Sequence, residues 1–238
     1  CFRILSNHPI VFVKPQQLDM SSYLPFIGDN EINTEAFDSQ FFVDIRGYNR
    51  LMLSQEFYAR FLKYKYMLIY QLDAFVFKDE LSYWCKQGYD YIGAPWIVRQ
   101  RLSKRLLSYV HYKLNWKQKN SISPTNLQFA NRVGNGGFSL RKIKKFFDIC
   151  GSHKKMIDFY NQHSYNHFFN EDVFWSAEVN RYKKKLAIPN YKVAINFSIE
   201  QQPSLGLTLI TGDLPFGMHA AHVYPDVWNP IIQKALKS

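Results

Sequence analysis

Two kinds of apolar pattern alternate along the first part of the chain. Residues 10–13 and 66–70 are short continuous apolar runs, typical of strands buried on both faces, and the run 66–70 has the character of a central parallel strand. Residues 48–65 repeat apolar side chains with a helical period and predict one amphipathic helix. Its apolar stripe holds Leu53, Phe57 and Phe61.

The rest of the chain continues the alternation of helices and strands. A helix is predicted to begin at Asp79, a good N-cap residue. The later predictions are a strand at 89–96 ended by Pro95, a glycine turn leading into a helix at 132–142, a helix at 170–182, a strand at 191–200 and a loop at 215–225. Helices and strands in alternation favour a layered α/β fold.

Composition narrows the choice of partner. The chain has 238 residues, which suits one large α/β domain, and a formal net charge of +11. Such a charge favours an anionic partner, although a basic solvated surface explains most of the lysines equally well. No RNP, KH, zinc-finger or helix-turn-helix signature accompanies the charge, so nucleic acid is not the expected partner.

Cysteine usage and hydropathy bear on location. Cys1, Cys85 and Cys150 show no CxxC spacing, which indicates reduced thiols and a cytoplasmic setting. No apolar run reaches the roughly 18 residues of a membrane-spanning helix, and no signal peptide is visible.

A single carboxylate, Asp73, interrupts the apolar run 67–77. Ligands of open α/β sheets gather at the carboxyl ends of strands, and Asp73 comes just after the predicted strand 66–70. A carboxylate there is either a turn or cap residue, or an oxygen ligand that presents Mg²⁺ or Mn²⁺ to a diphosphate.

Three further elements could carry chemistry. Gly136 and Gly137 belong to a "GNGG" turn that is either simply tight or a wall on which a sugar approaches the main chain. Glu171 and Asp172 are either first-turn acids of a helix or a source of a general base. His219, with His222 nearby, is either an ordinary loop histidine or a metal ligand, but shows no zinc spacing.

Taken in order, these elements resemble a GT-A-type glycosyltransferase. More narrowly, the chain is similar to a bacterial family of proposed glycosyltransferases first catalogued as a domain of unknown function. The resemblance is carried, over residues 47–220, by "GYNRLMLS", "YQLDAFVF", "YDYIGAPW", "VGNGGFSLR", "NEDVFW" and "PFGMHA".

The resemblance implies a GT-A (Rossmann-like) fold, a mixed and mostly parallel central sheet flanked by helices, as a single catalytic domain over 1–238. Residues 1–98 would form the nucleotide-sugar half, without the family's first strand, and residues 99–238 the acceptor half. Asp73 stands at the last Asp of an Asp-x-Asp motif. Gln71 replaces the first Asp and is a weaker cation ligand that can bind a ribose or a bound water.

The same resemblance implies the remaining roles. Gly136 and Gly137 match a Gly-Gly segment that contacts donor or acceptor, Asp172 the catalytic acid beside Glu171, and His219 a late metal-binding histidine. A hexosyltransferase that uses Mn²⁺ or Mg²⁺ would move sugar from a nucleotide-diphosphate sugar to a hydroxyl of a glycan or lipid-linked glycan, with inversion, in surface polysaccharide or glycoconjugate synthesis.

Two tryptophans and one basic segment complete the expectations. Trp96 and Trp175 either stack on sugar faces or pack in the core. Residues 99–119 form a basic amphipathic pattern, either a peripheral contact with the anionic inner face of the membrane or a solvated helix. Because Gln71 weakens the metal motif, a non-catalytic carbohydrate-binding protein on a degenerate transferase fold remains the alternative.

Overall fold

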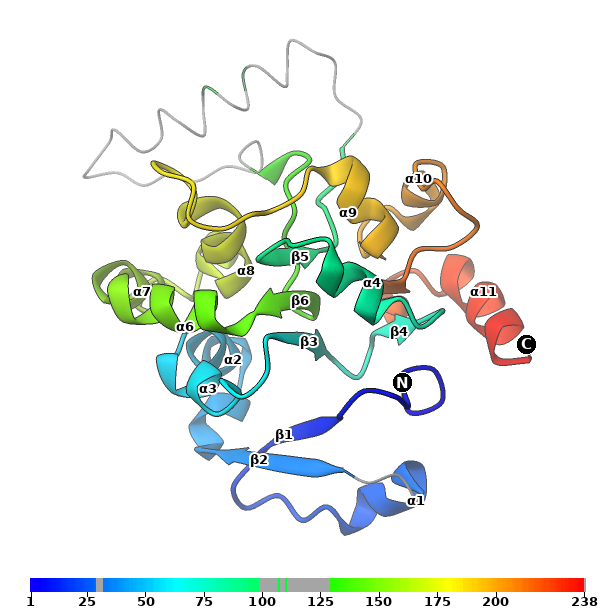
Figure 1. Cartoon of the computed structure of the whole chain (residues 1–238), viewed down its shortest axis with the longest axis horizontal. Helices are drawn as coiled ribbons and strands as arrows, with labels where there is room; N and C mark the ends of the chain where they lie inside the picture. Colours follow the sequence, from blue (N-terminus) through cyan, green and yellow to red (C-terminus); the bar gives the residue numbers. More distant parts are fainter. Residues whose placement is uncertain (29–31, 99–106, 108–109, 111–128, 238) are drawn as a thin grey trace. The chain divides into compact units, whose positions relative to one another are not determined.

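The protein is a mixed α/β structure, seen in a computed structural model that describes residues 1–28, 32–98, 107, 110 and 129–237 (Figure 1). It contains two compact units. Unit 1 comprises Cys1–Lys65 and Ile143–Glu171, and unit 2 comprises Tyr66–Lys142 and Asp172–Ser238. Each unit is built from separated segments of the chain. The expected halves 1–98 and 99–238 stay a prediction.

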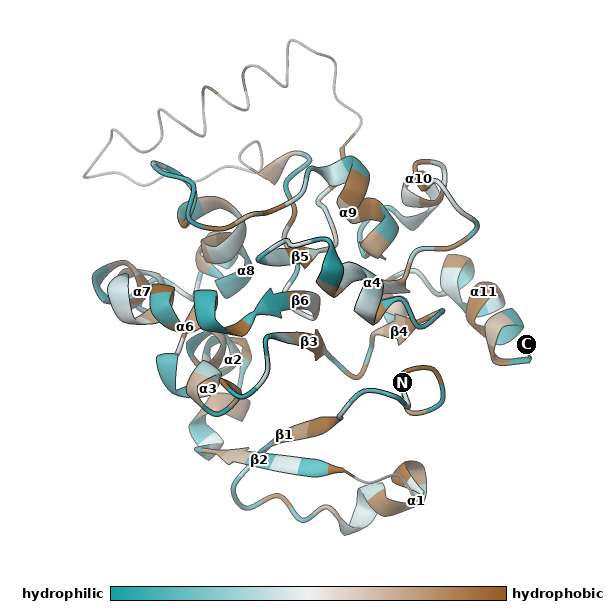
Figure 2. Ribbon diagram, in the orientation of Figure 1, coloured by the Kyte–Doolittle hydropathy of each residue, from teal (hydrophilic) through white to brown (hydrophobic). Residues whose placement is uncertain are grey.

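Unit 1 combines a small parallel sheet with helices. Strand β1 (Val11–Pro15) pairs with β2 (Asn33–Phe37) in parallel, with Val11 opposite Asn33. In Figure 2, β1 is mostly brown and β2 mostly teal and white, so β1 is the more apolar strand, although the most buried residue of the sheet is Phe37 of β2. The helices are η1 (Ser21–Tyr23), α1 (Leu24–Ile27), η2 (Ser39–Phe42), α2 (Ile45–Met52), α3 (Gln55–Ala59), α6 (Ile143–Ser152), α7 (Lys154–Gln162) and η4 (His167–Phe169).

The helix expected at 48–65 is divided in two. Helix α2 ends at Met52, and α3 begins after Ser54, whose hydroxyl accepts a hydrogen bond from the Phe57 backbone N–H at 3.1 Å. This N-cap starts a new helix and explains the break. Leu53, Phe57 and Phe61 are all buried, as predicted, but only Phe57 lies in a helix, since Leu53 follows α2 and Phe61 follows α3.

Unit 2 holds two three-stranded sheets. The first has the order β3 (Tyr66–Tyr70), β6 (Phe138–Lys142), β5 (Tyr91–Gly93), side by side in Figure 1, with both ladders antiparallel. The second has the order β4 (Phe75–Val76), β8 (Gly217–Met218), β7 (Ser198–Ile199); β4 pairs with β8 antiparallel and β7 with β8 parallel. The helices are α4 (Leu81–Lys86), the π-helix η5 (Phe174–Glu178), α9 (Tyr191–Phe197), α10 (Pro203–Leu207), η6 (Ala221–Val223) and α11 (Pro225–Lys237). Helix α8 (Glu171–Val173) includes the last residue of the second segment of unit 1.

Three local predictions are wrong. The run 66–70 is a strand, but its partner β6 is antiparallel, not parallel. The glycine turn at 132–142 leads into β6 before helix α6 begins. Residues 191–200 are mostly helix α9, because the Asn190 side chain accepts hydrogen bonds from two backbone N–H groups of its first turn; only Ser198 and Ile199 form a strand.

Other predictions agree with the structure. The apolar run 10–13 gives β1, and residues 89–96 contain β5. A helix is present after Asp79, but its N-cap is Glu80 and not Asp79. The basic segment 99–119 lies almost entirely outside the residues that the structure describes. No helix in the described part of the chain has the length and apolar character needed to cross a membrane.

Candidate functional site

Two strand ends of the β4–β8–β7 sheet bring acidic and imidazole side chains together. Strands β7 and β8 run in parallel with Ile199 opposite Met218, so the next residues, Glu200 and His219, leave the sheet at the same edge. Strand β4 runs antiparallel to β8, which places Asp73, just before β4, at this edge too. The Ala221 backbone N–H donates to the Asp73 carbonyl at 3.4 Å and ties the two segments together.

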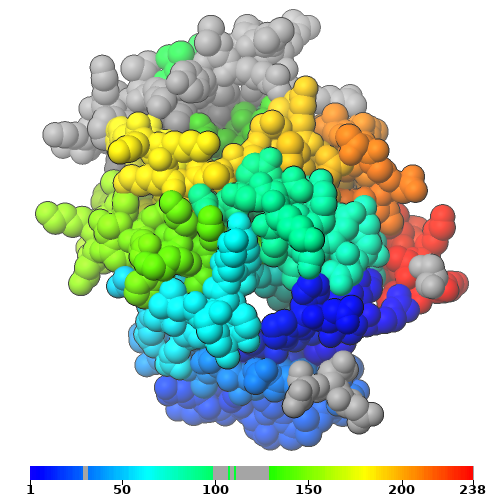
Figure 3. Space-filling view, in the orientation of Figure 1, coloured from blue at the N-terminus to red at the C-terminus, as the bar shows by residue number. Residues whose placement is uncertain are grey.

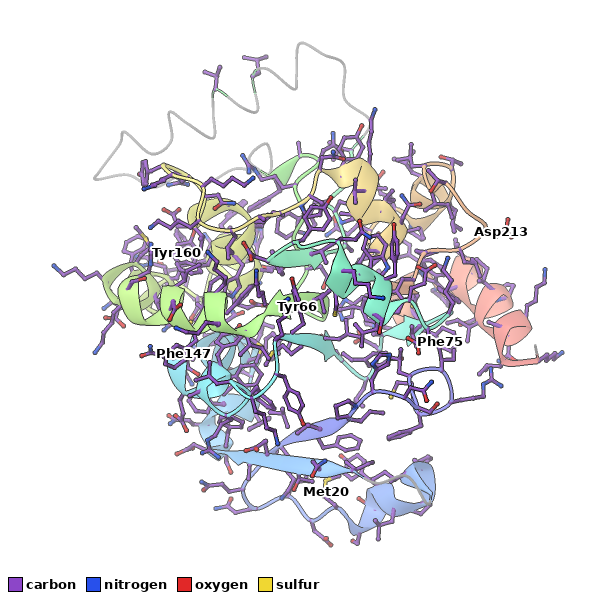
Figure 4. All side chains as sticks on the ribbon, in the orientation of Figure 1. Met20, Tyr66, Phe75, Phe147, Tyr160 and Asp213 are labelled. Atoms are coloured by element: carbon purple, nitrogen blue, oxygen red, sulfur yellow. The ribbon has the colours of Figure 1, made fainter. Side chains whose placement is uncertain are left out.

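The end of the β3–β6 ladder supplies the next residues. Tyr70 is opposite Phe138, and the Gln71 backbone N–H donates to the Gly137 carbonyl at 2.9 Å. The ladder therefore continues one residue beyond β3 and delivers the Gln71 side chain to the site. Phe75, labelled in Figure 4, marks the start of β4 beside it.

His219 is the centre of this arrangement. Its Nε2 lies 3.0 Å from Gln71 Oε1 and 3.1 Å from Asp73 Oδ1. Its Nδ1 lies 3.3 Å from Glu200 Oε1 and 3.3 Å from Asn135 Nδ2. We call these five residues the His219 cluster.

The orientation of Asn135 gives His219 two alternative partners at Nδ1. Asn135 Oδ1 accepts the Gly137 backbone N–H at 2.8 Å, which fixes the amide so that its NH₂ faces the imidazole. A neutral His219 with its proton on Nε2 accepts from Asn135, whereas a protonated His219 donates to Glu200. The same imidazole is thus held in place in both charge states.

The surroundings of His219 favour its charged form. Burial acts to lower the pKa of this imidazole, but the hydrogen bond and charge of Glu200, together with the charge of Asp73, outweigh burial. The pKa of His219 is therefore raised above its usual value.

Asp73 has a second imidazole beside it. His222 Nδ1 lies 3.3 Å from Asp73 Oδ2, and its side chain is largely exposed. Both carboxylate oxygens of Asp73 therefore face a histidine, Oδ1 toward His219 and Oδ2 toward His222.

Position 137 requires glycine because the His219 and Gln71 side chains lie close to its backbone. A Cβ atom at this position would lie 2.2 Å from His219 Nε2 and 2.5 Å from Gln71 Oε1. The backbone next to the cluster is also unusual, since Asn135 and Ala220, the residue after His219, have φ values of 64° and 56°. Non-glycine residues in this region cost on the order of 1 kcal/mol and gather at functional sites.

The other predicted binding residues have different surroundings. The Gly136 carbonyl accepts from Ser139 Oγ at 3.0 Å and from Arg141 Nη2 at 3.4 Å. Trp96 is partly exposed and packs against Phe129, at 5.1 Å between ring centroids. Trp175 is completely buried, so it has the core-packing role and no ring face open to a sugar.

The two acids of the "NEDVFW" stretch are separated by the division into units. Glu171 belongs to unit 1, is 2% exposed, and its N–H donates to Asn49 Oδ1 at 3.2 Å. Asp172 belongs to unit 2, is partly exposed, and its Oδ1 accepts the Val173 N–H at 2.7 Å. Asp172 thus serves the local backbone, and its expected role as the catalytic acid stays a prediction.

Sequence reasoning missed two members of the cluster. Glu200 comes directly after the apolar stretch that ends in β7, the same signal that drew attention to Asp73. Asn135 lies inside the "GNGG" turn, of which only the glycines were candidates from the sequence. Its Oδ1 accepts the Gly137 N–H within the turn, and its Nδ2 contacts His219 Nδ1.

The cluster contains suitable atoms for a hard divalent cation. Carboxylate and amide oxygens and an imidazole nitrogen are ligands that Mn²⁺ accepts. Among the residues described, no group of three or more His, Cys, Asp or Glu side chains is already arranged around a metal position. Asp73 and His219 contact each other directly, so a cation between them requires the two side chains to part.

The fold and the site define a mixed α/β protein with a polar cluster at its strand ends. The family model described as "Protein of unknown function (DUF5672)" matches residues 31–219, and the chain belongs to this family. No curated protein and no solved structure matches the chain.

Proposed function

We propose that the protein is a GT-A-type glycosyltransferase that moves a sugar from a nucleotide-diphosphate sugar to a hydroxyl acceptor. The observation that supports this most is the convergence of Gln71, Asp73 and His219 at adjacent strand ends, over a glycine whose Cβ would fill the site. Ligands of α/β proteins bind at such edges. The order of the six sequence stretches also supports the proposal.

The residues of the cluster would act on the departing diphosphate. Asp73 and His219 would hold Mn²⁺ or Mg²⁺, which supplies positive charge to the leaving group when bound. Gln71 receives a hydrogen bond at Oε1 and can donate from Nε2 to a ribose or phosphate oxygen. His219 must be neutral to ligate a cation, so the metal and a protonated His219 are alternative sources of positive charge at this edge.

Asp172 is the proposed general base. It would take the proton of the acceptor hydroxyl as this attacks the anomeric carbon. Direct displacement inverts the anomeric configuration. Glu171 is the second candidate in sequence, but its burial makes it the less accessible acid.

A thermal-shift screen of nucleotide sugars with and without Mn²⁺ tests the proposal. One donor should raise the melting temperature, because a ligand that binds only the folded state stabilises it. The variant Asp73→Asn should lose the Mn²⁺-dependent part of the shift, whereas Asp172→Asn should keep donor binding and lose transfer. Asp213→Asn, in an exposed loop (Figure 4), is the matched control and should behave as wild type.

The pairing of both Asp73 oxygens with imidazoles favours a second candidate. A carboxylate already occupied in this way suits a non-catalytic carbohydrate-binding protein that needs no cation. Slow release of nucleoside diphosphate from the donor identified in the screen separates the two, since only a transferase hydrolyses its donor. Binding without any such release, at all Mn²⁺ concentrations, would favour the binding protein.

A further inference from the structure

Residues 181–185, with the sequence "RYKKK", form a loop of unit 2 that we call the basic loop. Lys183, Lys184 and Lys185 are all exposed, and Tyr182 is 55% exposed. Arg181 is paired with Glu178 at 3.2 Å. Lys183 and Lys184 have no ion pair with any residue that the structure describes, so the outer part of the loop carries uncompensated positive charge.

The basic loop is fixed in shape by its flanking residues. Asn180 Oδ1 accepts the backbone N–H groups of Lys185 and Leu186, at 2.8 and 2.9 Å, and its Nδ2 donates to the Leu186 carbonyl at 2.8 Å. The Leu186 side chain is fully buried. These contacts hold the backbone of Lys185 and Leu186 and so fix the end of the basic loop.

The far end of the basic loop joins the edge of β5. The Ala187 N–H donates to Asp90 Oδ2 at 2.8 Å, and the Asp90 N–H donates to the Ala187 carbonyl at 2.7 Å. Asp90 Oδ1 also lies 3.2 Å from Lys142 Nζ. Asp90 is thus engaged by Lys142 and by the Ala187 backbone.

This attachment places the basic loop away from the His219 cluster. In the β3–β6–β5 sheet, Lys142 is opposite Tyr66, whereas the cluster follows Tyr70 at the other end of β3. The five residues of β3 span about 14 Å at 3.4 Å per residue. The basic loop therefore lies apart from the proposed diphosphate position. In Figure 3 the segment, in yellow, lies on the visible surface.

We propose that the basic loop docks unit 2 onto an anionic lipid surface. Lys183 and Lys184 are adjacent and exposed, and such lysines are attracted to the negative surface of an anionic lipid layer. Tyr182 offers an amphipathic ring of the kind that settles at the membrane–water interface. The proposal is independent of the transferase assignment, since it uses none of the residues of the His219 cluster.

Vesicle sedimentation of the full chain tests the proposal. Vesicles of phosphatidylcholine mixed with phosphatidylglycerol should bind the wild type, and pure phosphatidylcholine vesicles should not. Each lysine near such a surface contributes about fivefold in binding, so Lys183→Gln with Lys184→Gln should weaken it about thirtyfold. The matched control, Lys154→Gln with Lys155→Gln, removes the same charge from two adjacent exposed lysines of α7 and should weaken binding much less.

Three results would overturn the proposal. The first is failure of the wild type to bind the anionic vesicles. The second is an equal loss in the two double variants, which would indicate a general effect of net charge. The third is equally tight, equally lysine-dependent binding to a single-stranded oligonucleotide, which would indicate an unselective polyanion site. An unchanged melting temperature shows that the variants fold. Donor binding of the double variants, measured without lipid, should equal that of the wild type, which separates the lipid proposal from the transferase proposal.

Discussion

Nδ1 of His219 lies 3.3 Å from Oε1 of Glu200, although 19 residues separate them in the chain. The contact exists because the two residues follow β8 and β7, which pair in parallel. A carboxylate on one ring nitrogen of a histidine fixes the ring orientation and leaves the other nitrogen to act. Here the other nitrogen faces Gln71 and Asp73.

Glu200 should therefore position His219 without contacting a ligand itself. Glu200→Ala removes the acceptor and the charge that raise the pKa of His219, so this pKa should fall, whereas Glu200→Gln removes only the charge and keeps an acceptor. Imidazole NMR titration measures both variants. Glu200→Gln should retain the cation-dependent thermal shift better than Glu200→Ala. If Glu200→Ala and Glu200→Gln show the same His219 pKa and the same cation-dependent thermal shift, Glu200 has no positioning role.

The raised pKa of His219 links stability to pH. An imidazole whose pKa is higher in the folded than in the unfolded state contributes stability that is fully present below the unfolded value, about 6.5, and is lost as pH rises through the folded pKa. The free energy of unfolding of wild type should exceed that of His219→Gln by more at about pH 5 than at about pH 8. Urea titrations measure this difference. His167→Gln, which removes an exposed imidazole of η4, is the control variant.

Much of the local structure follows from short-range chemistry that the sequence displays. The burial of Leu53, Phe57 and Phe61 could be predicted from the sequence, and so could the strand before Asp73. The direction of the strand that pairs with β3 could not be predicted. Its partner β6 is more than 60 residues away, and no local pattern specifies whether a distant partner is parallel or antiparallel.

For the candidate site, too, the sequence indicated individual residues but not all of their contacts. Asp73, Gln71, Gly137 and His219 were candidates from the sequence, and the structure brings them together. Glu200 was missed because residues 191–200 were expected to form one strand, which hid the single residue that follows the short β7. The meeting of Glu200 with His219 depends on the register of β7 and β8, which is a tertiary property.

Gly137 should tolerate no side chain. In Gly137→Ala the new Cβ would lie 2.2 Å from His219 Nε2, and overpacking of this kind costs about 1–3 kcal/mol. We expect a lower free energy of unfolding together with loss of donor binding, measured by urea titration and thermal shift. Gly212→Ala is the matched control, because a Cβ there meets no atom within 4 Å. A Gly137→Ala protein as stable as Gly212→Ala would show that the site is more open than its contacts indicate.

The start of α9 provides a test of the residue that overturned the strand prediction. Asn190 Oδ1 accepts the N–H groups of Lys192 and Val193 at 3.0 and 3.2 Å. Replacing it with alanine should lower the free energy of unfolding by about 1 kcal/mol, because the first turn loses its side-chain acceptor. Asn190→Ser keeps an acceptor and should recover most of the loss. Urea titrations of both variants give the comparison, and a Ser variant no better than the Ala variant would mean that burial of Ala194, Ile195 and Phe197 alone directs this segment into a helix.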